Sequence, residues 1–198
     1  MSEHADIIDH LAGVDAASPL EALRARRPIT KANAQASWNA LFEPVSPSDV
    51  TLAERFAVAL FVSLLHGQRE AAEFYAGKLR ALPDGTPLAD IVTVLADEAA
   101  TTGPYGDYPA GPLSAENKPG LAFSVAGKER AIVEERLAAA LEHSHLLVFH
   151  PRDANPARLQ KLLDAGWTTT GIVTLSQLVS FLAFQLRVVS GLKVLADA

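Results

Sequence analysis

The chain has 198 residues, of which 49% are apolar, 7% aromatic and 20% charged. This composition excludes a disordered chain and suits one folded domain or two small ones. A net charge of −6 leaves no basic field for phosphates, so we predict no nucleic-acid partner. Cysteine is absent from the sequence, which excludes disulfides, Cys-ligated zinc, iron–sulfur clusters and thiol chemistry by these residues.

Targeting and membrane signals are weak. The N-terminal residues include acids and no basic stretch before an apolar run, so we expect no secretory signal and a cytoplasmic protein. Residues 172–192 are apolar and long enough to cross a bilayer, but they include Gln177, Gln185 and Arg187. We interpret this segment as a buried core helix and expect no membrane partner.

Helix-start signals recur along the chain. Ser18-Pro19 followed by Glu21 predicts a helix from about Pro19 to Arg26, because the Ser hydroxyl caps the first turn. Similar starts are Thr51 with Glu54, Thr86-Pro87, and Asn155-Pro156, whose helix Gly166 can end. Apolar residues at three- and four-residue spacing connect these signals, and no segment alternates like a strand. The sequence therefore predicts an all-α fold.

The sequence divides into two helical halves. Residues 101–126 are rich in Gly and Pro, which predicts a loop or arm between an N-terminal half, 1–100, and a C-terminal half, 127–198. Tyr105 and Tyr108 suit an arm that reaches a neighbouring subunit, or a loop that folds back over its own domain. A shift of 117 residues aligns 56–70 with 173–187, which indicates either a pseudo-repeat or the chance similarity of two apolar helices.

The aligned helices suggest a polar site. His66 and Glu70 are four residues apart, so on one helix they would share a face, and Arg187 lies on the matching face of the second segment. A His–Glu pair can fix the imidazole tautomer for proton transfer, and Arg can bind a carboxylate. The alternative is a Glu70–Arg187 ion pair that only bridges two packed helices.

Two stretches of the chain resemble a known superfamily. TLAERFAVALFVSLLHGQREAAEFYAGKL and ARLQKLLDAGWTTTGIVTLSQLVSFLAFQLRVVSGLKVL are similar to the carboxymuconolactone decarboxylase and alkylhydroperoxidase D-like superfamily, in its tandem, peroxidase-related branch. The resemblance implies a helical bundle in which two pseudo-repeated halves surround a central helical hairpin. It also implies a homo-oligomer, a trimer or a hexamer.

The resemblance assigns a redox helix to residues 51–82, and here that helix is degenerate. Active peroxidase relatives have a glutamate, Cys-x-x-Cys and a histidine. The matching cysteine positions hold Gln68 and Ala71, while Phe56 stands at the glutamate and Phe74 or Tyr75 at the histidine. Because no residue of the chain can form a sulfenic acid, we predict no thiol-dependent peroxide reduction.

Decarboxylase members of the superfamily work without the cysteine pair. The resemblance therefore implies a cysteine-free protein that binds a small molecule or performs cofactor-free acid–base chemistry in a helix-lined cavity, with His66, Glu70 and Arg187 as candidate catalytic residues. The alternative is a non-catalytic structural or regulatory oligomeric binding protein. We expect no cofactor and no metal, since on a helix His145 would point away from His143 and His150.

Overall fold

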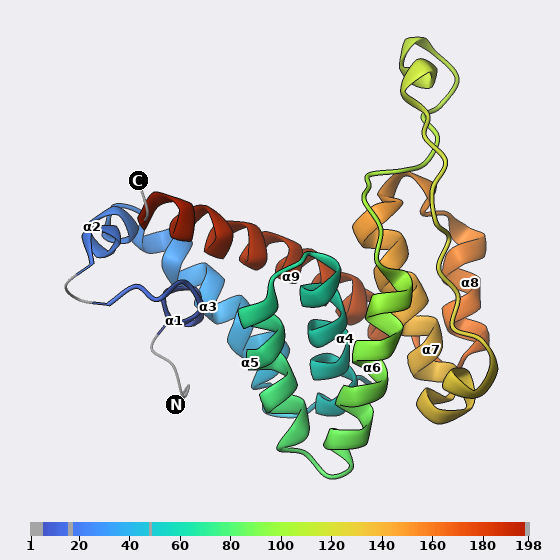
Figure 1. Cartoon of the computed structure of the whole chain (residues 1–198), viewed down its shortest axis with the longest axis horizontal. Helices are drawn as coiled ribbons and strands as arrows, with labels where there is room; N and C mark the ends of the chain where they lie inside the picture. The colour runs from blue at the N-terminus through green and yellow to red at the C-terminus, as the bar shows by residue number, and fades with distance from the viewer. Residues whose placement is uncertain (1–5, 16–17, 48, 197–198) are drawn as a thin grey trace.

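A computed structural model describes residues 6–15, 18–47 and 49–196. In these ranges the regular structure is helical, and the only β-type pairing is an isolated bridge between Gly106 and Lys118. The all-α prediction is confirmed. Met1 and the other residues before Asp6, on which the expectation of no secretory signal partly rests, lie outside the described residues. The helices are α1 (Ile7–Ala12), α2 (Pro19–Ala25), α3 (Pro28–Phe42), α4 (Leu52–Leu65), α5 (Arg69–Arg80), α6 (Gly85–Ala99), α7 (Gly127–Phe149), α8 (Pro156–Asp164), α9 (Thr169–Ala196) and the 3-10 turns η1 (Pro112–Glu116) and η2 (Pro151–Asp153) (Figure 1).

The predicted helix starts are confirmed at three caps. The Ser18 and Asn155 side chains accept backbone N–H groups of the first turns of α2 and α8. Thr51 and Glu54 form the reciprocal capping box of α4. The helix predicted to start at Thr86-Pro87 begins one residue earlier, at Gly85, after Asp84 in the left-handed conformation. Gly166, with φ +86°, follows α8 as predicted.

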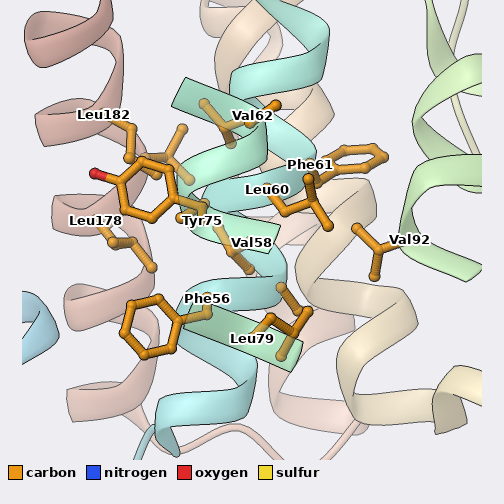
Figure 2. Close-up of a cluster of buried hydrophobic side chains, with 14 of the residues drawn as sticks. Phe56, Val58, Leu60, Phe61, Val62, Tyr75, Leu79, Val92, Leu178 and Leu182 are labelled. Carbon is orange, nitrogen blue, oxygen red and sulfur yellow. The ribbon is translucent and has the colours of Figure 1, made fainter. Parts of the chain in front are cut away.

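Helix α4 lies at the centre of the fold, where it packs against α3, α5, α6, α7 and α9. Its residues from Arg55 to Ser63 are all buried. Figure 2 shows apolar side chains of α4 between Leu178 and Leu182 on one side and Val92 on the other. This position explains why the α4 sequence is apolar on every face, because no face meets solvent.

Helix α9 joins two parts of the molecule. Its C-terminal part packs with α1, α2 and α3, and the rest packs against α4, α7 and α8 (Figure 1). In the described part of the chain α9 is the one helix with the length and hydropathy of a membrane span, and 44% of its most apolar window is buried. The buried residues include Leu175, Leu178 and Leu182, so one side of α9 is a core surface.

The Gly/Pro-rich segment forms an arm. Figure 1 shows its middle part standing away from the helices, with η1 at the tip, whereas Tyr105 and Val125 near its two ends are buried against the same chain. Its base is held by contacts to the end of α7 and to η2. Tyr105 N–H donates to the Phe149 carbonyl at 2.6 Å, and the Arg152 guanidinium donates to the Tyr108 hydroxyl at 2.9 Å and lies over that ring.

Arg136 on α7 connects three turns of the chain. Its guanidinium donates to Glu54 Oε1 at 2.6 Å, to the Gly166 carbonyl at 2.7 Å and to the Asp49 carbonyl. It also lies 4.2 Å from the centre of the Trp167 ring, whose N–H donates back to the Arg136 carbonyl. One side chain thereby fixes the start of α4, the α8–α9 turn and α7 relative to one another.

The variant Arg136→Met tests this connection. We expect the free energy of unfolding to fall by about 3 kcal/mol, because the largely buried Glu54 carboxylate and two carbonyls lose their donor. The matched control is Arg80→Met, whose ion pair with Asp90 is exposed and should contribute less than about 1 kcal/mol. Urea denaturation followed by circular dichroism measures both, and equal losses would contradict the role of Arg136.

Candidate functional site

His66 and Glu70 do not share a helix. Helix α4 ends at Leu65, His66 is its C-cap, and Gly67 takes the left-handed φ of +67° before α5 begins at Arg69. The predicted redox helix, 51–82, is therefore two helices joined by a turn, and the i,i+4 prediction for His66 and Glu70 is wrong. The physical reason is Gly67, which adopts positive φ without a side-chain clash and ends the helix.

The predicted pairing of Glu70 with Arg187 is also wrong. Glu70 is exposed and forms an ion pair with Lys193, whereas Arg187 donates Nη1 to the Ala183 carbonyl of its own helix at 3.0 Å. Because α5 starts only after the Gly67 turn, its first turn meets α9 six residues beyond Arg187. Six helical residues span about 9 Å along the axis, which separates the two side chains.

The structure does bring His66 and Arg187 to one surface depression, which we call the His66–Arg187 groove. A part of about 570 Å³ lies between the end of α4, the arm segment Thr101–Pro104, the end of α7 and α9. A second part, of about 340 Å³, is lined by the same two residues together with Gln68 and Ser190. Two of the three predicted site residues therefore lie together, and Glu70 lies outside.

The groove is electrostatically suited to an anion. No acidic residue lines either part, and Arg187 has no carboxylate partner within the described ranges. Burial, and then the positive charge of Arg187, lower the pKa of His66 below its usual value. Its Nε2 is shielded from solvent and has no hydrogen-bond partner. The groove thus combines a guanidinium that has no carboxylate partner with an imidazole that is neutral at pH 7.

The two former cysteine positions have separate environments. Gln68 lines the groove, and its amide nitrogen donates to the His66 carbonyl at 3.5 Å, whereas Ala71 is buried in α5. Tyr75, at one of the two positions that the resemblance gives to the histidine, is fully buried and donates its hydroxyl to Gln185 Oε1 at 2.6 Å. Figure 2 shows this hydroxyl turned towards α9. Burial raises the pKa of Tyr75, so its hydroxyl stays protonated as a core hydrogen-bond donor.

The three C-terminal histidines line a second cavity, of about 260 Å³, which sequence reasoning missed. His150 lies just beyond the end of α7, at its C-cap. His143 Nε2 lies 3.3 Å from Ser176 Oγ, and His145 Nε2 lies 3.2 Å from the Ala99 carbonyl oxygen. Across the described ranges, no three His, Cys, Asp or Glu side chains are grouped so that they could hold a metal ion. The close sequence spacing of the histidines was the available signal for this cavity.

Comparisons with models of protein families, with curated proteins and with solved structures gave no match to this chain. The resemblance to the carboxymuconolactone decarboxylase and alkylhydroperoxidase D-like superfamily therefore stays a prediction.

The buried histidines make stability depend on pH. Burial lowers the pKa of His143 to about 4, and burial together with the nearby His150 lowers that of His145 to about 4. Because the same side chains in the unfolded chain bind protons near pH 6.5, the unfolded state holds more protons between these values. Stability is therefore full above pH 6.5 and is lost as the pH falls towards 4.

We expect the free energy of unfolding to decrease by up to about 2–3 kcal/mol per pH unit in this window. Urea titrations at several pH values between about 6.5 and 5 measure the slope. This pH window lies above the range in which ordinary carboxyl groups titrate. The variant His143→Gln should remove about half of the slope, since one of the two groups is gone. A slope that is unchanged in this variant would show that the pKa of His143 is not lowered in the folded protein.

Proposed function

We propose that the protein binds a small organic carboxylate in the His66–Arg187 groove. The observation behind this proposal is that a guanidinium without a carboxylate partner and a neutral imidazole line one depression that contains no acidic residue. Arg187 would bind the carboxylate through paired N–H donors, the geometry that suits guanidinium best. The apolar walls, which include Leu65, Val148 and Val179, would hold the rest of the molecule.

His66 would supply acid–base chemistry to a ligand in this groove. A neutral imidazole can accept a proton, and the bound carboxylate would stabilise the resulting cation. The reaction would use no cofactor and no metal, and no thiol is present for peroxide reduction. Glu70 has no part in this proposal, because its carboxylate faces Lys193.

We also propose the alkylhydroperoxidase D-like arrangement as the fold. The pairing of α4 with α5 across the Gly67 turn would be the central helical hairpin, with Gln68 and Ala71 at the former redox positions. The close packing of α4 with α5 supports this assignment. We also propose that the protein is cytoplasmic, as its sequence indicates.

The carboxylate site is tested with benzoate and its neutral amide, benzamide. Titration followed by the nitrogen-15 side-chain resonances of the histidines should show benzoate binding that shifts His66, and no such binding of benzamide. Arg187→Gln should weaken binding about tenfold or more, because the guanidinium that binds the carboxylate through paired donors is lost. The same variant should raise the pKa of His66, because the neighbouring positive charge that lowers it is gone.

The control for this titration is Lys193→Gln. It removes a cation of the same helix that faces Glu70 and does not line the groove. Benzoate binding should be unchanged in this variant. Equal binding of benzoate and benzamide, or full binding by the Arg187→Gln variant, would contradict the proposal.

The second candidate function is that of a homo-oligomeric structural or regulatory protein, a trimer or a hexamer. The observation that favours it is an exposed row along α9 with three- and four-residue spacing. Val173, Phe184 and Val194 of this row are 57%, 42% and 67% exposed. The row also contains Gln177, Ser180, Arg187 and Gly191, and its exposed apolar side chains are of the kind that a second copy can cover.

Light scattering coupled to size exclusion tests this candidate. We expect a mass of at least three chains, and Phe184→Glu should lower it, because a charge in an apolar contact is costly. Val94→Glu is the matched control, since Val94 is comparably exposed but lies on α6. A mass near 21.0 kDa for the unmodified protein would rule out a stable oligomer.

A further inference from the structure

The second cavity, which we call the His143 pocket, lies between α7, α8 and the chain segment 122–124. It shares no lining residue with the His66–Arg187 groove. Its walls are apolar at Phe123, Leu146 and Leu162. The Phe123 ring is held in place by ring contacts with Phe61 and His145. The pocket therefore offers a fixed aromatic wall.

His143 lines this pocket and has a hydrogen-bond acceptor without a partner. The hydroxyl of Ser176 donates to the Ile172 carbonyl at 2.9 Å, so its oxygen is left to accept the proton of His143 Nε2. A neutral imidazole has one N–H, so Nδ1 is then the acceptor. His143 is 5% exposed, and its Nδ1 is buried without a partner. A buried acceptor of this kind is stabilised by a donor from a ligand or water.

The cationic side of the pocket belongs to α8. Arg158 and Lys161 are three residues apart, so they lie on one side of the helix. No salt bridge joins either of them to a carboxylate in the described part of the chain, although the charge of Arg158 helps to lower the pKa of Asp153. The one carboxylate that lines the pocket, Glu142, is already bound by Arg130 at 2.7 Å and by Val125 N–H at 3.0 Å.

His150 is similarly occupied by Asp153 and by the Leu121 carbonyl. Arg158, Lys161 and the Nδ1 acceptor of His143 are therefore available to a ligand.

We propose that the His143 pocket binds a small aromatic carboxylate with a hydroxyl group at its far end. The carboxylate would lie against Arg158 and Lys161, and the ring would pack on Phe123 and Leu162. The hydroxyl would donate to His143 Nδ1. A ligand without the hydroxyl would leave the buried acceptor unpaired, and this cost makes the pocket selective. This site is independent of the carboxylate proposed for the groove.

Three probes separate the parts of this proposal in calorimetric titrations of the intact protein. The full ligand is para-hydroxyphenylacetate, phenylacetate lacks the donor, and the methyl ester of para-hydroxyphenylacetate lacks the charge. We expect para-hydroxyphenylacetate to bind about tenfold or more tightly than either of the others. Equal affinity for all three, or no binding of para-hydroxyphenylacetate up to its solubility limit, would overturn the proposal.

Variants locate the site. The double variant Arg158→Gln and Lys161→Gln should weaken para-hydroxyphenylacetate binding about tenfold or more. Arg69→Gln with Arg80→Gln is the matched control, because it removes the same charge from the surface of α5 and should leave binding unchanged. His143→Phe should abolish the preference for the hydroxyl compound over phenylacetate. If that variant does not fold, the comparison of the two probes on the unmodified protein still decides the role of the acceptor.

Arg187→Gln distinguishes the two sites. It should leave the hydroxyl preference intact, because Arg187 lines only the groove. Loss of that preference in Arg187→Gln, with full binding by the α8 double variant, would place the bound carboxylate in the groove and overturn the assignment to the His143 pocket.

Discussion

The Arg136 guanidinium is the contact that fixes the starts of α4 and α9 relative to α7. It binds Glu54 at the start of α4 and the carbonyl of Gly166 before α9, and it stacks on Trp167. Glu54 uses its other carboxylate oxygen in the capping box with Thr51, so the same side chain starts α4 and orients it. An ion pair that also completes a helix cap is worth more than an exposed pair, because both partners are already ordered.

The geometry of the groove follows from this contact. With the starts of α4 and α9 fixed together, the two helices run past each other through the core, and each helix reaches the groove at a defined residue. Gly67 ends α4 so that His66 stays at the edge of α9 rather than on a continuing helix. The charge of Arg187 therefore acts on His66, while Glu70 is displaced to Lys193. The point at which α4 ends thus determines that His66 and Arg187 line the same groove and that Glu70 does not.

Sequence analysis predicted the features that depend only on neighbouring residues, such as the helix caps. The caps at Ser18, Thr51 and Asn155 need only neighbouring residues, so they could be read directly. The partner of Glu70 could not be predicted in the same way, because it depends on whether Gly67 adopts a positive φ and ends α4. The break in α7 at Glu134, with φ +64°, has no signal of Gly or Pro at that residue. The His143 pocket required the packing of α8 against α7, which periodicity does not give.

Both cavities have a local charge opposite to that of the whole protein. The chain has a net charge of −6, yet each cavity has guanidinium or ammonium groups without carboxylate partners. At physiological ionic strength the Debye length is about 8 Å, so distant surface carboxylates are screened while a cation in contact with a ligand is not. The acidic surface therefore does not prevent anion binding, and it reduces long-range attraction of polyanions such as nucleic acid. Selectivity in this protein would then come from short-range contacts inside each cavity, whose lining combines a neutral imidazole with at least one cation.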